Sequence, residues 1–280
     1  MLKKIFIFLL IIGITSSVNA QIKTPQSSPF SKIEQVVGLT DVSLEYSRPA
    51  MRGRIIFGGL VPYGKIWRTG ANANTKITFG DNVMIDGQKL VKGTYAIYTI
   101  PNKTSWDILF YSDANNWGKP KTWDESKVAA KTTVQVVPME MNVDSFTMSF
   151  DDLTSGSAVL GLLWENIYVG VKFEVPTDKI TSKSIEVIMN GPTSNDYYQA
   201  ATYYHTEGKD LKQALAWMKK ATEGDNPEFW YLRRMSLIQA DLGDKIGAIK
   251  TAKQSLAGAE KAGNSDYVKM NNESIAEWQQ

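Results

Sequence analysis

Residues 157–175 read SAVLGLLWENIYVGVKFEV, and apolar side chains take every second position along this stretch. The alternating residues are Ala158, Leu160, Leu162 and Trp164, followed by Val169, Val171, Phe173 and Val175. A period of two is typical of a β-strand that packs one face on a core, because successive side chains point to opposite faces. Phe146, Met148 and Phe150 repeat the pattern just upstream. The chain is therefore predicted to form a sheet with one apolar face.

The same period, broken by turn residues, extends outward over residues 33–175. Phe79–Val83 and Ile85–Gln88 are predicted hairpin turns, and the Asp-Gly pair of the second suits a positive φ. Gly93–Pro101 is predicted to be a strand that faces Trp106–Tyr111 across a short loop. Roughly nine to eleven strands, with no helix between them, predict an antiparallel β-sandwich or a jelly roll.

After Pro176 the apolar spacing becomes helical, and glycines 208, 224, 243 and 263 mark helix ends. Five helices are predicted, over residues 195–207, 211–222, 227–242, 245–261 and 266–279. The small residues around Ala214 return around Ala248, 34 residues later, which is the period of a tetratricopeptide repeat. This part is therefore predicted to form tetratricopeptide-like helical hairpins.

These patterns predict a mainly β protein with an α-helical tail. The predicted organisation is a signal peptide over residues 1–20, a β-sandwich domain over 21–178, a linker with a short strand-like piece over 179–194, and a helical tetratricopeptide-like domain over 195–280.

The first twenty residues have the three parts of a secretory signal peptide. A basic start, Met1-Leu-Lys-Lys, precedes an apolar run from Ile5 to Ile14, and Val18-Asn-Ala20 offers a cleavage site. We expect the mature chain to start at Gln21 and to reside in the periplasm. No cysteine follows the run, so no lipid anchor is expected, and no later segment is predicted to enter the membrane.

Composition excludes several chemistries. The chain has no cysteine, a single histidine (His205) and a net charge of +2. Zinc sites of the His/Cys type, Ser-His-Asp triads and Cys-His nucleophiles all lack the required residues. The small net charge argues against a nucleic-acid partner. We expect no metal and no cofactor, and interpret His205 as a packing or surface residue of its helix.

Residues 46–74, YSRPAMRGRIIFGGLVPYGKIWRTGANAN, hold four of the six arginines and are called the arginine segment below. Arginine offers a planar fork of donors for carboxylate, phosphate or carbonyl groups. One interpretation is a ligand-binding wall for an anion or a carbohydrate. The other is a long loop that crosses the sandwich and is held by arginine bonds to backbone carbonyls. The candidate ligand-binding residues are Arg48, Arg54, Tyr63, Trp67, Arg68, Thr69 and Asn72, together with Glu165.

Carboxylates are the groups left for catalysis, as in glycoside hydrolysis. Glu165 ends an apolar stretch beside Trp164, and Asp81, Asp107 or Asp113 could supply a second carboxylate. The alternative, which we favour, is that Glu165 is the counter-ion of a clustered arginine, because buried arginines need partners.

Two further tryptophans, Trp117 and Trp123, lie in the polar stretch 112–127. They fit exposed sugar platforms, a lid, or anchors of this loop on the core, and anchoring is the favoured interpretation.

The chain resembles domain of unknown function family 2911 over most of its length. The motifs that carry the resemblance are Ser47-Arg-Pro49, Gly53-Arg54, Ile56-Phe-Gly58, Leu60-Val-Pro-Tyr-Gly64, Trp67-Arg-Thr-Gly-Ala-Asn-Ala73, Gly93-Thr-Tyr95, Thr99-Ile-Pro101, Trp117-Gly118, Leu162-Leu-Trp-Glu165, Tyr197-Tyr-Gln-Ala-Ala201 and Asn264-Ser-Asp-Tyr-Val268. The resemblance implies an exported protein of Bacteroidetes-type bacteria and no particular activity. Arg52 stands where the family pattern favours lysine, which turns attention to Arg48, Arg54 and Arg68.

We therefore expect a non-enzymatic, exported β-sandwich that binds a small anionic or carbohydrate ligand, with a helical tail that binds a protein partner. The alternatives are a carboxylate-dependent hydrolase of envelope glycans and a protein–protein scaffold.

Overall fold

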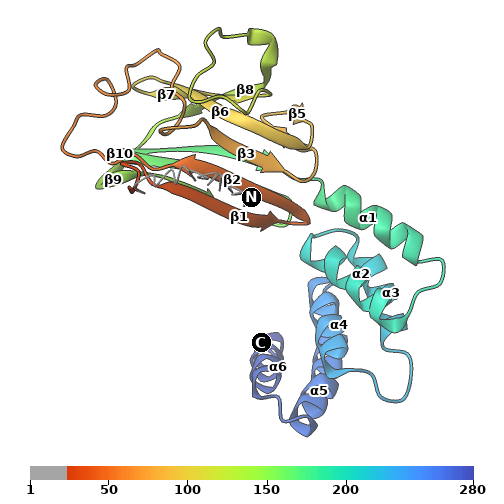
Figure 1. The fold of residues 1–280 in the computed structure, drawn as a ribbon. Helices are drawn as coiled ribbons and strands as arrows, with labels where there is room; N and C mark the ends of the chain where they lie inside the picture. The colour runs from red at the N-terminus through yellow and green to blue at the C-terminus, as the bar shows by residue number, and fades with distance from the viewer. Residues whose placement is uncertain (1–23) are drawn as a thin grey trace, which may run out of the picture. The chain divides into compact units, whose positions relative to one another are not determined.

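The computed structural model describes residues 24–280, so the predicted signal peptide and the start at Gln21 lie outside the described residues. The chain divides into two compact units, the first ending at Val175 and the second beginning at Pro176 (Figure 1). The first is built of strands and the second of helices, which confirms a mainly β fold with a helical tail.

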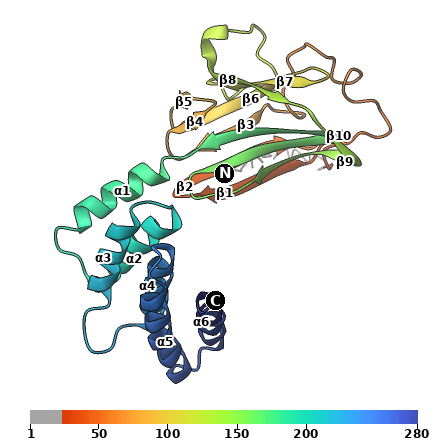
Figure 2. The ribbon, with the colours of Figure 1, turned by 180° about the vertical axis from the view of Figure 1, so that it is seen from behind.

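The β unit consists of two antiparallel sheets, which Figure 2 shows from behind. The six-stranded sheet has the order β1-β2-β3-β6-β7-β8 and the four-stranded sheet the order β5-β4-β10-β9. The strands are β1 (Phe30–Val37), β2 (Thr40–Ser47), β3 (Thr75–Phe79), β4 (Val83–Ile85), β5 (Gln88–Leu90), β6 (Gly93–Pro101), β7 (Ser105–Tyr111), β8 (Val128–Gln135), β9 (Val137–Asp151) and β10 (Ser157–Glu174).

The long strand β10 contains an irregularity that its sequence requires. Buried side chains fall on even positions as far as Trp164 and on odd positions from Val169 onward. A strand keeps one parity on each face unless a bulge shifts it. The pairing of β10 with β9 shifts on either side of Glu165, whose φ is +56°. The extra residues lie on β9, and the positive φ of Glu165 changes the parity of β10 so that both apolar runs face the same core.

Of the two predicted hairpin turns, one forms a hairpin and the other connects the two sheets. Ile85–Gln88 is a hairpin as predicted, and Asp86 and Gly87 both have positive φ, at 49° and 71°. Phe79–Val83 is not a hairpin, because β3 belongs to the six-stranded sheet and β4 to the four-stranded sheet. The prediction failed there because a local turn signal does not reveal which sheet the next strand joins.

The main core lies between the sheets and includes Phe79, Trp106, Phe146, Trp164 and Phe173, all almost fully buried. The side chains of β10 that alternate in the sequence belong to it.

A smaller core covers the opposite face of β6 and β7. Tyr98 and Tyr111 are buried there, and Trp123 stacks on Tyr111 with ring centroids 4.5 Å apart. Trp123 therefore anchors the loop that contains the 3₁₀ turn η1 (Glu125–Lys127), whereas Trp117 is 75% exposed. The anchoring role is thus confirmed for Trp123, and the role of the exposed Trp117 stays a prediction.

The second unit contains six helices: α1 (Thr177–Ile188), α2 (Ser194–Thr206), α3 (Leu211–Ala221), α4 (Phe229–Asp241), α5 (Lys245–Lys261) and α6 (Ser265–Trp278). Five of them lie within two residues of their predicted bounds. Side chains of Thr193, Asp210, Asp244 and Asn264 cap the starts of α2, α3, α5 and α6. Helix α2 contacts α3, and α4 contacts α5. The tetratricopeptide character of these hairpins stays a prediction.

Helix α1 corrects the prediction of a linker with a strand-like piece over residues 179–194. The β-branched run Ile185-Glu-Val-Ile188 favours a strand by composition. However, residues 177–188 contain no glycine or proline, and Pro176 directly precedes the helix, where its fixed φ is tolerated.

Among the described residues, no helix has the length and apolar character needed to span a membrane.

Helix α1 is tied to the rest of its unit by Asp178. Lys209 Nζ lies 2.5 Å from Asp178 Oδ1, and the Tyr203 hydroxyl donates to the same oxygen at 2.9 Å. The hydrogen bonds from Lys209 and then from Tyr203 hold the pKa of Asp178 below its ordinary value of 3.8. Because the folded-state pKa is lowered, these contacts stabilise the fold at neutral pH and are lost as the pH falls through that lowered value.

We expect acid to release α1 through Asp178. In wild type, the protection of α1 amides, corrected for intrinsic exchange, should persist from pH 7 to about pH 4, near the ordinary pKa of aspartate, and fall at lower pH. In Asp178→Asn it should already be low at pH 7. Hydrogen-exchange mass spectrometry of the α1 peptides measures both. Wild-type protection of α1 in Asp178→Asn at pH 7 would show that this carboxylate does not hold the helix.

Candidate functional site

The arginine segment is a succession of tight turns at the β unit. Its residues with positive φ are Arg52, Gly53, Gly58, Gly64, Thr69, Gly70 and Asn72. At Gly58 a side chain would meet the ring of Tyr63, since a Cβ built there lies 2.7 Å from that ring. The segment is fixed to both sheets, because Ala50 bridges to Ser145 of β9 and Trp67 bridges to Thr99 of β6.

Glu165 holds the middle of the segment through its backbone. Its carboxylate oxygens accept hydrogen bonds from the amides of Ile56, at 3.1 Å, and Phe57, at 3.3 Å. Among residues 24–280, no ion pair joins Glu165 to an arginine, so the expected counter-ion role is wrong. At the irregularity in β10, the Glu165 carboxylate binds two consecutive amides of the segment instead.

Trp67 joins the segment to the main core. Its indole stacks on that of Trp164, with centroids 5.7 Å apart and planes inclined by 18°. Phe57, Trp106 and Phe146 approach it edge to face. This cluster fixes Trp67 in place, because each aromatic pair of this geometry stabilises the fold by about 0.5–1.5 kcal/mol beyond its burial.

The four arginines of the segment have different partners. Arg48 has a structural role, because its guanidinium joins the segment to β9 by donating to Phe146 O and Thr147 Oγ1. Arg54 donates to the carbonyls of Ala50 and Met51, four and three residues before it. Each of the remaining two makes a single bond of this kind. Arg52 donates to Ser27 O and Arg68 to Asn72 O.

Arg52, Arg54 and Arg68 line one cavity of about 330 Å³, called the arginine cavity below. Trp67 and Trp164 form part of its apolar wall. None of the three arginines forms an ion pair with a carboxylate among residues 24–280, and no described aspartate or glutamate lines the cavity. A guanidinium has five N–H donors, so each of the three retains donors beyond its backbone bonds.

The other predicted site residues support the segment without lining the arginine cavity. Tyr63 packs on the main core and on Gly58, and Thr69 Oγ1 donates to Thr99 Oγ1 at 3.2 Å. Asn72 Nδ2 donates to three acceptors, and two of these are Gln26 Oε1 and Ser28 O of the chain that precedes β1.

Sequence reasoning missed Arg52 and Trp164 as lining residues. The sequence does contain a signal for Arg52, because Met-Arg-Gly-Arg (residues 51–54) places one arginine on each side of a turn glycine. For Trp164 no such signal exists, since its alternating position assigns it to the core, where most of its side chain does lie.

The carboxylates considered for catalysis each have a local partner. Asp81 accepts from Thr40, Asp107 pairs with Lys131, and Asp113 pairs with Lys127. Neither these residues nor Glu165 line the arginine cavity. Within the described part of the chain, no three histidine, cysteine, aspartate or glutamate residues gather as a metal site would require.

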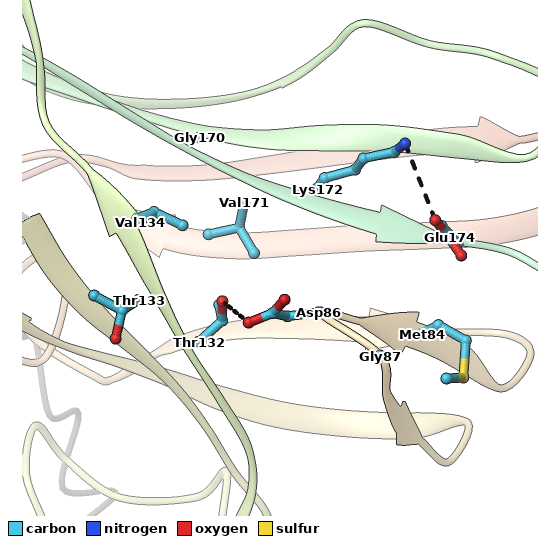
Figure 3. A pocket seen from close by; sticks show the side chains of 10 residues that line it. All are labelled: Met84, Asp86, Gly87, Thr132, Thr133, Val134, Gly170, Val171, Lys172 and Glu174. Carbon is cyan, nitrogen blue, oxygen red and sulfur yellow. Dashed lines mark hydrogen bonds and ion pairs between the residues drawn. The ribbon is translucent and has the colours of Figure 1, made fainter.

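A different cavity, of about 470 Å³, lies between β8, β10 and the β4–β5 hairpin (Figure 3). Its charged groups have partners of their own. Asp86 accepts from Thr132 Oγ1 at 3.0 Å, and Lys172 lies 4.0 Å from Glu174. Its charges of both signs give no preference for an anion or a cation. The arginine cavity is smaller but has charge of one sign, so it is the stronger candidate.

Fold and cavity together define a mainly β protein whose antiparallel sandwich carries a cationic cavity beside an aromatic core. Residues 28–173, slightly more than half of the chain, match the family described as protein of unknown function (DUF2911). The chain belongs to this family. The match spans the whole arginine segment and ends before the helical unit. No curated protein and no solved structure matches the chain.

Proposed function

We propose that the β-sandwich is a non-enzymatic binding module that takes an anionic ligand into the arginine cavity. The observation that carries the proposal is that Arg52, Arg54 and Arg68 line this cavity without a carboxylate partner among residues 24–280. The predicted export would place this binding in the periplasm.

Electrostatics favours an anion over a neutral ligand. Three like charges around one cavity repel each other, and the repulsion is relieved when an anion binds between them. Arginine also recognises carboxylates and phosphates through two parallel hydrogen bonds, which fixes the orientation of the ligand. Trp67, half-buried and stacked on the buried Trp164, offers an apolar edge to the rest of the ligand. An acidic sugar, with a carboxylate on a ring, suits both features.

The hydrolase alternative has less support. Glycosidases place two carboxyl groups about 5–10 Å apart on either side of the bond. Glu165 accepts two backbone hydrogen bonds, and no described carboxylate lines the arginine cavity. The cavity is thus suited to holding an anion and lacks the acid and base that hydrolysis needs.

The interaction role of the helical tail stays a prediction. A groove of about 280 Å³ between α1 and α2, lined in part by Ile185, Ile188 and Ala200, is the feature that favours it. The tetratricopeptide-like spacing of Ala214 and Ala248, both fully buried, is consistent with hairpins that pack closely.

Galacturonate and galactose form a matched pair of probes, since they differ by one carboxylate. We expect isothermal titration calorimetry to detect galacturonate binding and no galactose binding. Arg52→Gln/Arg54→Gln should weaken galacturonate binding at least tenfold, because each charge-assisted hydrogen bond contributes about 1.5–3 kcal/mol. Both arginines are exposed, so the variant should fold normally.

The control is Lys89→Gln/Lys92→Gln, which removes the same charge from exposed positions on and just after β5. It should bind galacturonate as wild type does. Equal binding of both sugars, or equal losses in both double variants, would contradict an anion site in the arginine cavity.

A further inference from the structure

A second cavity adjoins the arginine cavity. It has a volume of about 420 Å³, is lined by Lys65 and Lys119, and is called the lysine cavity below. Four residues line both cavities, namely Leu60, Val61, Trp67 and Arg68. The two cavities are therefore neighbours across one shared wall.

Charge of one sign extends across this wall. Arg52 and Arg54 lie on one side, Lys65 and Lys119 on the other, and Arg68 lines both. No described aspartate or glutamate lines either cavity. A surface with five positive charges in two adjoining hollows attracts a ligand with several separated negative groups more strongly than a single anion.

Gly118 lets its loop pass close to Arg68. A Cβ built on Gly118 would lie 2.8 Å from Arg68 Nη1, so a side chain there would displace the guanidinium. The backbone is held at this distance because Tyr98, buried under the loop, donates to Gly118 O at 2.9 Å. The close approach brings the next residue, Lys119, beside Arg68, and the preceding residue, Trp117, stays exposed.

We infer that the natural ligand is an acidic oligosaccharide whose consecutive anionic groups occupy the arginine and lysine cavities. The inference rests on the proposed function and adds the class and length of the ligand. Each cavity is near the lower end of the size range of small-ligand sites, which suits one sugar ring on each side of the shared wall. Trp67, on that wall, offers an apolar edge to the rings.

A nucleic acid fits these observations less well. Single-stranded nucleic acid needs several aromatic side chains on which successive bases stack. Trp67 and Trp164 cover each other, which leaves Trp117 as the exposed ring of this region. The net charge of +2 also gives no long-range field for a polyphosphate chain.

The test compares chain length and charge among probes. Calorimetry at low ionic strength would measure galacturonate, tetragalacturonate, a sulfated chondroitin tetrasaccharide, neutral maltotetraose and a short oligothymidylate. Linking anionic groups makes the second contact intramolecular, so we expect an acidic tetrasaccharide to bind about tenfold or more tightly than galacturonate. Comparison of the two tetrasaccharides tells whether carboxylate or sulfate is preferred.

Lys65→Gln/Lys119→Gln should remove most of this gain and weaken galacturonate binding far less than Arg52→Gln/Arg54→Gln does. Both lysines are exposed, and the variant is expected to keep the wild-type fold. Arg52→Gln/Arg54→Gln should weaken the binding of both the monomer and the tetrasaccharides. Maltotetraose should not bind.

The possible failures are distinguishable. If galacturonate binds and neither acidic tetrasaccharide binds more tightly, or if the lysine variant keeps the gain, the two-cavity ligand is wrong and the anion site stands. If oligothymidylate binds as tightly as the acidic tetrasaccharides, the carbohydrate class is wrong. If no anionic probe binds to wild type, the proposed function itself fails.

Discussion

Replacement of Trp164 by alanine is expected to lower the free energy of unfolding of the sandwich by about 3–5 kcal/mol. Trp164 is only 2% exposed and contacts the rings of Phe57, Trp67 and Phe146. Its indole also donates to Asp144 O at 2.9 Å. The substitution removes the stacking partner of Trp67 and opens a void between the sheets, which the neighbouring rings cannot fill without leaving their own contacts.

Urea unfolding of the full chain, followed by hydrogen-exchange mass spectrometry, would measure this loss and separate peptides of the sandwich from those of the helices. The matched control is Trp117→Ala, because Trp117 is 75% exposed. That variant should differ from wild type by no more than about 0.5 kcal/mol. Similar losses in the two variants would contradict the assignment of Trp164 to the core.

Glu165→Gln is expected to destabilise the arginine segment by about 1–3 kcal/mol. The carboxylate accepts from the amides of Ile56 and Phe57, and both of these residues are buried. A glutamine side chain has one oxygen that accepts and one nitrogen that only donates, so one buried amide would lose its partner. The cost arises although the size of the side chain is nearly unchanged.

Exchange of the Ile56 and Phe57 amides should accelerate in Glu165→Gln, as measured by NMR on the labelled protein. Glu174→Gln is the control, because Glu174 is exposed at the end of the same strand and its ion pair with Lys172 is long, at 4.0 Å. It should leave these two amides unchanged. Unaltered exchange at Ile56 and Phe57 in Glu165→Gln would show that other contacts hold the segment.

Much of the fold could be predicted because its signals are local. Alternation along residues 157–175 indicates a strand wherever the strand lies, and the five helices after residue 194 follow from spacing and capping residues. Helix α1 was missed because its β-branched end resembles a strand by composition. The sheet change between β3 and β4 was missed because it depends on partners far away in the sequence.

The candidate site could be located from the sequence but not resolved into roles. A cluster of arginines among glycines marks residues 46–74 as a segment of specific geometry. In an irregular segment with many positive φ values, no period tells where a side chain points. Arg48 joins the segment to β9 because its acceptor is Phe146 O, 98 residues away, whereas Arg54 donates to a carbonyl four residues before it and Arg52 to Ser27 O, 25 residues before it.

The sequence alone established a β unit and a helical unit, because the strand and helix periods of apolar residues are properties of short stretches. It also established that the chemistry has no cysteine and one histidine, because that depends on residue counts alone. Which residues line the two cavities depends on the tertiary structure. The irregular pairing at Glu165 lets its carboxylate hold the backbone of residues 56 and 57, and a glycine at position 118 allows a loop to approach Arg68. Trp67, stacked on Trp164, forms part of the wall that the two cavities share. Each of these contacts joins residues that are distant in the chain, and their distances follow from how the two sheets pack rather than from any local pattern.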